Sequence, residues 1–214
     1  LINSSEDADN LVLGKGYRVY YFDPEKLGDK SIDKLSEVLC ANDKWRFTAD
    51  TPSGESVAFL WVYKKGDTLS NGGGGSAELF NKGRKVMEGV IKANNDSAEP
   101  ILIEYGSYFI FVYHTDDNDY VLPILGDAVI DESFLQVTNY KQLPTGSDLI
   151  EQVNANYEES LTQPDTICGG AALTLKADIN MPDSNLPNHL IITVIAICAT
   201  AAAGAIIVIV HKKV

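Results

Sequence analysis

Residues 101–125 read ILIEYGSYFIFVYHTDDNDYVLPIL, a run of three short apolar segments separated by two clusters of turn-forming residues. Aromatic and β-branched residues fill 101–105, 108–114 and 120–125, which is typical of strands. Gly106-Ser107 separates the first two segments, and the polar residues 115–119 separate the last two. This stretch therefore predicts an up-and-down β meander.

Working outward from the meander, the chain alternates strand-like and helix-like segments. Strands are predicted at 17–22, 44–49 and 57–63, of which the last is apolar throughout, as in a central strand. Apolar residues at helical spacing predict helices at 31–40, 76–93 and 148–157. The order β-α-β-β-α-β predicts an α+β fold, a ferredoxin-like sandwich with two helices on one face of its sheet and the meander extending that sheet.

Residues 190–210, LIITVIAICATAAAGAIIVIV, contain no charged side chain. At 1.5 Å per residue, 21 residues form a helix roughly 31 Å long, which matches the hydrocarbon thickness of a bilayer. We therefore expect one transmembrane helix here, with the lipid bilayer as its partner; a buried core helix is the alternative.

The charges beside this segment predict its orientation. Lys212 and Lys213 follow it directly, and basic flanks stay on the cytoplasmic side of a membrane. The expected organisation is a flexible lead-in (1–13), an extracytoplasmic α+β domain (14–157), a stalk (158–189), the membrane helix (190–210) and a cytoplasmic tail (211–214). No signal peptide is visible, and the alternative is a tail-anchored protein with its domain in the cytoplasm.

The last thirty residues are similar to the cell-wall sorting signal of Gram-positive surface proteins. In that family a short proline-containing motif precedes a hydrophobic run and a basic tail, and a transpeptidase cuts between the Thr and Gly of the motif. The matching residues here are Asn185-Leu186-Pro187-Asn188-His189. Because Asn188 and His189 stand where the family has Thr and Gly, we expect a retained anchor rather than a processed one.

Composition narrows the classes of partner. With 30 acidic and 17 basic residues, the chain has a formal net charge of −13 and would repel phosphate backbones. We expect no nucleic-acid partner, and no cofactor motif is present. Among three cysteines, Cys40 and Cys168 form the one candidate disulfide, and the absence of a Cys-x-x-Cys pair disfavours a zinc site.

One glycine-rich stretch suggests anion binding. Gly74, Gly75 and Ser76 precede the predicted helix at 76–93, where free N–H groups and the helix dipole attract negative charge. The Lys of a nucleotide-binding loop is missing, and the composition equally fits a flexible linker. His114 is the one histidine of the expected domain, and we assign it no catalytic role.

Three further patterns each have a plainer alternative. Asp116, Asp117 and Asp119 could offer oxygen ligands to calcium, although consecutive acids in a hairpin more often form a solvated turn. Asn3 and Asn95 begin N-glycosylation sequons.

The third pattern lies in the predicted membrane helix. Ala196, Thr200 and Gly204 place small residues at every fourth position, which would allow close helix packing.

Two functions remain. The first is a single-pass, membrane-anchored, non-catalytic surface module that binds another protein or assembles laterally as a homo-oligomer; an exposed patch including Tyr17, Tyr20, Trp61 and Tyr108 would favour it. The alternative is an anchored hydrolase or small-anion-binding domain centred on 72–76. That alternative requires a pocket shared with His114.

Overall fold

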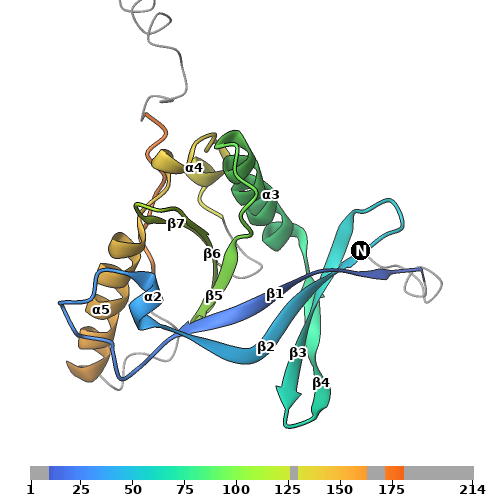
Figure 1. Cartoon of the computed structure of the whole chain (residues 1–214), viewed down its shortest axis with the longest axis horizontal. Coiled ribbons are helices and arrows are strands. Elements are labelled where there is room, and N and C mark those ends of the chain that lie inside the picture. Colours follow the sequence, from blue (N-terminus) through green and yellow to red (C-terminus); the bar gives the residue numbers. More distant parts are fainter. Residues whose placement is uncertain (1–9, 126–129, 163–171, 181–214) are drawn as a thin grey trace, which may run out of the picture. The chain divides into compact units, whose positions relative to one another are not determined.

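The computed structural model describes residues 10–125, 130–162 and 172–180 (Figure 1). The chain divides into two compact units, Leu1–Met181 and Pro182–Val214. All of the described residues belong to the first unit, and the second unit lies outside them.

One mixed sheet of seven strands organises this unit, in the order β4-β3-β2-β1-β5-β6-β7 (Figure 1). All neighbouring strands are antiparallel except β1 and β5, which run parallel. The strands are β1 (Val12–Phe22), β2 (Leu39–Asp50), β3 (Ser56–Lys65), β4 (Thr68–Ser76), β5 (Ile101–Tyr105), β6 (Tyr108–His114) and β7 (Asp119–Leu125).

Helices cover both faces of the β5-β6-β7 part of the sheet. The long helix α3 (Glu78–Ala93) and the short α4 (Glu132–Leu135) lie on one face. On the other face lie α5 (Gly146–Thr162) and the four-residue α2 (Leu35–Val38). A single 3-10 turn, η1 (Tyr140–Gln142), connects α4 to α5.

Two apolar cores result, one on each face of the sheet. Leu102 and Phe111 pack with Met87 of α3 in the first core. Ile103 and Ile110, their neighbours along the same strands, pack with α5 in the second. Because successive side chains of a strand point to opposite faces, a strand buried on both sides is apolar at nearly every position. This explains the composition of residues 108–114.

The meander prediction is confirmed almost residue for residue. β5 and β6 have the predicted bounds, and β7 begins at Asp119, one residue earlier than expected. The connecting turns are short and polar, so local sequence is sufficient to determine where each strand ends.

The α+β class is confirmed, but the ferredoxin-like topology is wrong. The segment predicted as a helix at 31–40 forms only α2, and Leu39 already begins β2, so β2 returns antiparallel beside β1. The loop expected after residue 67 is an additional strand, β4. The parallel neighbour of β1 is β5. The result is a mixed seven-stranded sheet rather than a split βαβ sandwich.

The transmembrane part of the fold prediction also requires correction. Within the ranges that the structure describes, no helix is long and apolar enough to cross a bilayer. The predicted membrane helix at 190–210 and its tail at 211–214 lie outside those ranges. The expected membrane span is therefore not supported.

Two glycines of α3 provide a matched test of how closely this helix packs on the sheet. A Cβ on Gly83 would collide with the buried Ile124 side chain of β7, whereas a Cβ on Gly89 meets nothing within 4 Å. We expect Gly89→Ala to stabilise the protein by about 0.5–1 kcal/mol through helix propensity. Gly83→Ala should destabilise it by about 1–2 kcal/mol through overpacking. Urea unfolding would measure both, and equal effects would contradict the described packing.

Candidate functional site

A buried ionic cluster joins the two halves of the sheet. Glu104 of β5 accepts hydrogen bonds from Arg46 of β2, from Nη2 at 2.7 Å and from Nε at 3.2 Å, and it also contacts Lys44. The side chains of Arg46 and Glu104 are 3% and 12% exposed. Tyr21 of β1, the strand between them, donates to the same carboxylate at 3.3 Å. Burial, and then the charge of Glu104, raise the pKa of Tyr21 well above its usual value.

Aromatic rings enclose this cluster. The guanidinium carbon of Arg46 lies 3.9 Å from the ring centre of Phe109 and 4.2 Å from that of Phe59. A guanidinium is planar and weakly hydrated, so it stacks on aromatic faces at low cost. Arg46 therefore connects β3, which carries Phe59, to β6, which carries Phe109.

The same row of aromatic residues explains the glycine run. On β3, Trp61 and Tyr63 lie over the backbone of β4, and a Cβ on Gly72 would collide with both rings. The ladder between β3 and β4 shifts register at this point, because Trp61 pairs with Gly73 while Val62 pairs with Asn71. Glycine in a strand often marks a bulge or a close approach of another group, and here it marks both.

β4 is an end strand with one open side, and we call this side the β4 edge. Every residue of Thr68–Gly75 is exposed or half-buried, and Leu69 is 74% exposed. The strand carries no charged residue and no proline, two of the devices that prevent edges from pairing, and it has a third such device, the bulge at Gly72. By contrast, the end strand β7 is partly covered, because Val121 donates to the carbonyl of Pro144 and Tyr120 bridges to Thr145.

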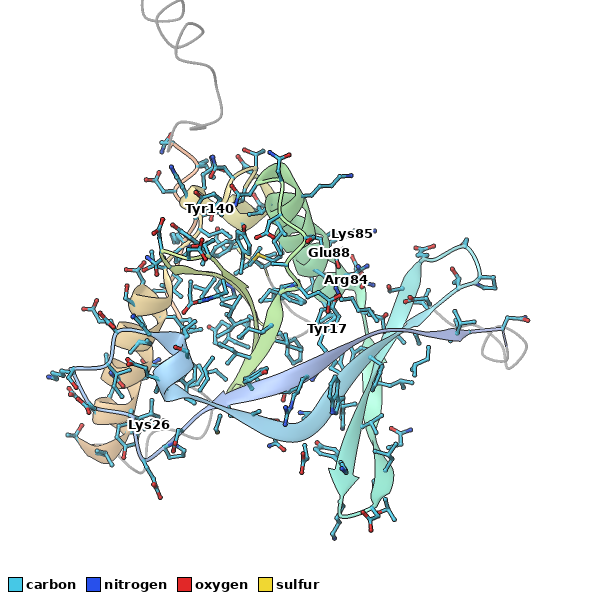
Figure 2. The ribbon with its side chains drawn as sticks, viewed as in Figure 1. Tyr17, Lys26, Arg84, Lys85, Glu88 and Tyr140 are labelled. Carbon is cyan, nitrogen blue, oxygen red and sulfur yellow. The ribbon has the colours of Figure 1, made fainter. Side chains whose placement is uncertain are left out.

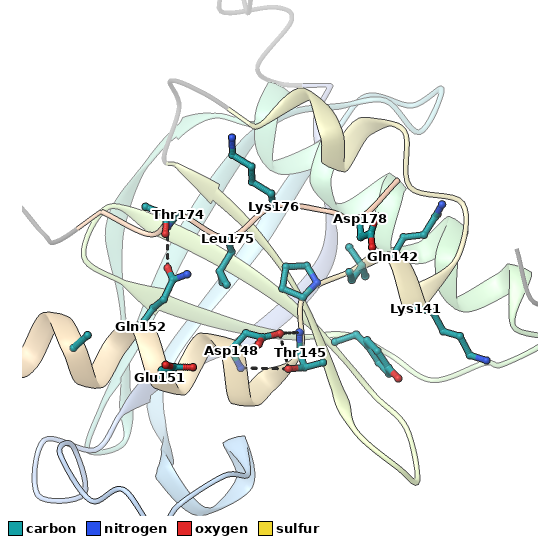
Figure 3. Close-up of a pocket in the computed structure, with 14 residues that line it drawn as sticks. Lys141, Gln142, Thr145, Asp148, Glu151, Gln152, Thr174, Leu175, Lys176 and Asp178 are labelled. Atoms are coloured by element: carbon teal, nitrogen blue, oxygen red, sulfur yellow. Dashed lines mark hydrogen bonds between the residues drawn. The ribbon is translucent and has the colours of Figure 1, made fainter. Parts of the chain in front are cut away.

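A cavity of about 830 Å³ lies beside α5 (Figure 3). Its walls are α5, residues 141–145 and an extended segment at 174–178. The N-terminus of α5 forms its floor, where Thr145 and Asp148 cap each other through N–H to oxygen hydrogen bonds of 2.8 and 3.2 Å. Charged side chains of both signs line the cavity, with Lys141 and Lys176 on one side of the balance and Asp148, Glu151 and Asp178 on the other.

The predicted anion-binding residues lie in a strand instead of a loop. Gly74 and Gly75 belong to β4 and pair with Leu60 and Phe59. Ser76 ends the strand. His114 lies on β6, and four strands separate β6 from β4. The small cavity at His114 is lined by Asp33, Lys34, Ser36 and residues 115–119, and none of residues 72–76 lines it. Anion binding at 74–76 stays an untested prediction.

The acidic residues of the β6–β7 turn lie around His114. Asp119 Oδ1 accepts a hydrogen bond from His114 Nδ1 at 2.6 Å, and Asp116 and Asp117 line the same small cavity of about 110 Å³. In the described part of the chain, no group of three His, Cys, Asp or Glu residues could hold a metal ion.

Of the two predicted glycosylation sites, Asn95 lies among the described residues and Asn3 does not. Asn95 lies exposed in the turn after α3, with a φ of 56°. Asn3 lies outside the described residues, as do Ala196, Thr200 and Gly204. Cys40 is exposed, and its predicted partner Cys168 also lies outside the described residues.

The expected tyrosine patch does not form around Tyr17. That residue is buried, with its ring edge-to-face against Phe80 and Phe111. Its hydroxyl donates to Glu88 of α3 at 3.4 Å, and Arg84 also binds Glu88 through Nη1 at 2.9 Å (Figure 2). Burial, followed by the charge of Glu88, raises the pKa of Tyr17 well above its usual value.

The ionic cluster is the feature that sequence reasoning missed. Arg46 and Lys44 alternate with aromatic residues in KWRFTA, and this pattern also fits polar side chains on a solvent-facing surface. Glu104, an acid inside the apolar strand ILIEY, is the one available signal, because a carboxylate at such a position requires a partner.

No protein family, no curated protein and no solved structure matches this chain.

Removing the charge of Glu104 should destabilise the fold severely. In Glu104→Gln, Arg46 and Lys44 lose their buried counter-ion, and breaking such a pair costs about 3–5 kcal/mol. Glu99→Gln is the control, because Glu99 is 76% exposed in its ion pair with Lys15 and its loss should cost less than about 1 kcal/mol. Chemical denaturation of both variants measures the difference, and similar costs would show that the cluster is not a central element of stability.

The buried phenol of Tyr17 should make stability fall at alkaline pH. Its folded pKa lies above the ordinary value of 10.0, so as pH rises past 10 the unfolded chain releases a proton that the folded one keeps. The stability associated with this proton is complete below pH 10 and is lost above it. Tyr17→Phe should therefore reduce the pH slope of unfolding stability above pH 10 by up to about 1.4 kcal/mol per pH unit. Parallel curves for variant and wild type would contradict this.

Proposed function

We propose that this protein is a non-catalytic assembly module whose β4 edge pairs with the β4 edge of a second copy. The observation that supports this is the contrast between the two ends of the sheet. β7 is partly covered by the chain itself, whereas β4 presents its outer backbone groups to solvent along Thr68–Gly75. An uncovered, uncharged end strand is a ready template for pairing with another chain.

Two copies of β4 suit each other in an antiparallel pair. A twofold axis makes both strands use the same surface, so one edge is sufficient for a closed dimer.

Charge does not oppose this contact despite the net charge of −13. β4 itself is neutral, and antiparallel pairing brings its hairpin end, where Lys64 and Lys65 outnumber Asp67, beside the end that leads into Glu78 of the second copy. The main-chain ladder would supply affinity, and Leu69 would add apolar contact at each end.

A charged residue at the edge tests the proposal. In Leu69→Lys, two like charges would enter the paired strands, and we expect the dissociation constant of the dimer to rise at least tenfold in sedimentation equilibrium. Leu161→Lys is the matched control, because Leu161 is 65% exposed at the end of α5, far along the chain from β4. It should dimerise like the wild type.

Two results would overturn the proposal. One is a wild-type chain that stays monomeric at about 100 μM, a concentration at which an interface with a micromolar dissociation constant is filled. The other is an equal loss of dimer in both variants, which would indicate a general effect of added charge.

The hydrolase or anion-binding alternative has no comparable support. Gly74 and Gly75 pair with β3 in a strand, and His114 lies beyond four intervening strands. The described geometry brings no nucleophile and base together at this glycine run.

A further inference from the structure

Residues 172–180 lie on the domain as a bound peptide would. They form neither helix nor strand, yet they follow a strict alternation in which Leu173, Leu175 and Ala177 are half-buried and the residues between them are exposed. Leu175 contacts both apolar cores of the domain. Alternation of this kind is typical of an extended peptide with one face against a protein surface.

The surface beneath holds this segment by its backbone. Four N–H groups of the segment donate to acceptors on β6, α5, α4 and η1, and three of these acceptors are side-chain oxygens. The bonds are Leu173 N to Tyr108 Oη (3.0 Å), Thr174 N to Gln152 Oε1 (2.8 Å), Ala177 N to Ser133 Oγ (3.3 Å) and Asp178 N to Gln142 O (2.8 Å). Because main-chain N–H groups are the same in any peptide, these acceptors do not require this particular sequence.

The segment does not fill the space in which it lies. The 830 Å³ cavity lies along it, lined by Thr174, Leu175 and Lys176 together with α5. A second cavity of about 270 Å³ is lined by Leu173 and the same three residues together with Tyr108 and Phe134. Both cavities open onto the protein surface, so the contact resembles an occupied groove more than a packed core.

From these observations we propose that the surface formed by β6, α4, η1 and α5, here the 172–180 groove, is a peptide-binding site. Its ligand is an extended segment of another protein with apolar residues at alternate positions. Residues 172–180 occupy part of the groove in cis and compete with that ligand. This site lies toward the β7 end of the sheet, whereas the β4 edge is at the other end. The proposal therefore does not depend on the proposed self-assembly.

The test uses a labelled peptide and the full chain. The probe is a fluorescent peptide of residues 172–180, and its anisotropy is followed during titration with protein. Leu175→Asp places a charge at the position of the segment that contacts both apolar cores, so the groove should open and bind the peptide in trans. A tethered segment competes at roughly millimolar effective concentration, so wild type should bind at least tenfold more weakly.

Two controls separate groove binding from nonspecific contact. Ala172→Asp adds the same charge at an exposed position of the segment that lines neither cavity, and it should behave like wild type. A peptide carrying Asp at its own Leu175 position should not bind any of the proteins.

Folding of Leu175→Asp is checked by thermal unfolding. If this variant does not fold, a protease site introduced between residues 163 and 171 of the wild-type chain replaces it; cleavage removes the tether without altering the groove. The labelled peptide should then exchange into the cleaved protein. Absence of binding to a folded Leu175→Asp or to the cleaved chain would overturn the proposal, as would equal binding of the Asp-substituted peptide.

Discussion

The described structure depends on the ion pair between Arg46 and Glu104. Each side chain would be costly to bury alone, and burying both requires good geometry and further hydrogen bonds. Here Glu104 receives Arg46, Lys44 and Tyr21, while the rings of Phe59 and Phe109 cover the guanidinium. Because the two partners lie on opposite sides of β1, the pair fixes the hairpin half of the sheet against the helix-covered half.

The ends of the sheet differ because of what lies beside them. The helix-covered half continues through residues 130–162 and 172–180, which supply caps, acceptors and apolar side chains around β7. The hairpin half ends at β4, whose glycines accept the rings of Trp61 and Tyr63 on one face. Among the described strands, β3 is the one hydrogen-bonded neighbour of β4, so the other side of β4 is open.

Local sequence predicted the elements better than their arrangement. Strand and helix types at 101–125 and in α3 follow from periodicity and turn chemistry, which act over a few residues. The β4 strand was not predictable in this way, since Gly72–Gly75 has the composition of a linker and low strand propensity. Its strand conformation comes from pairing with β3 and from contact with the rings of Trp61 and Tyr63, which β3 carries.

By itself, the sequence determined the α+β class, the meander, the helix on the meander and the acidic surface, because each depends on side-chain periodicity or charge alone. Tertiary structure alone decided the strand order, the burial of Tyr17 and the meeting of Lys44, Arg46 and Glu104. It also decided that residues 172–180, which resemble a stalk in sequence, lie against the domain. Those outcomes depend on which distant segments become neighbours. The residues next to a strand or an acidic side chain in the sequence do not indicate which strand or which base it will contact.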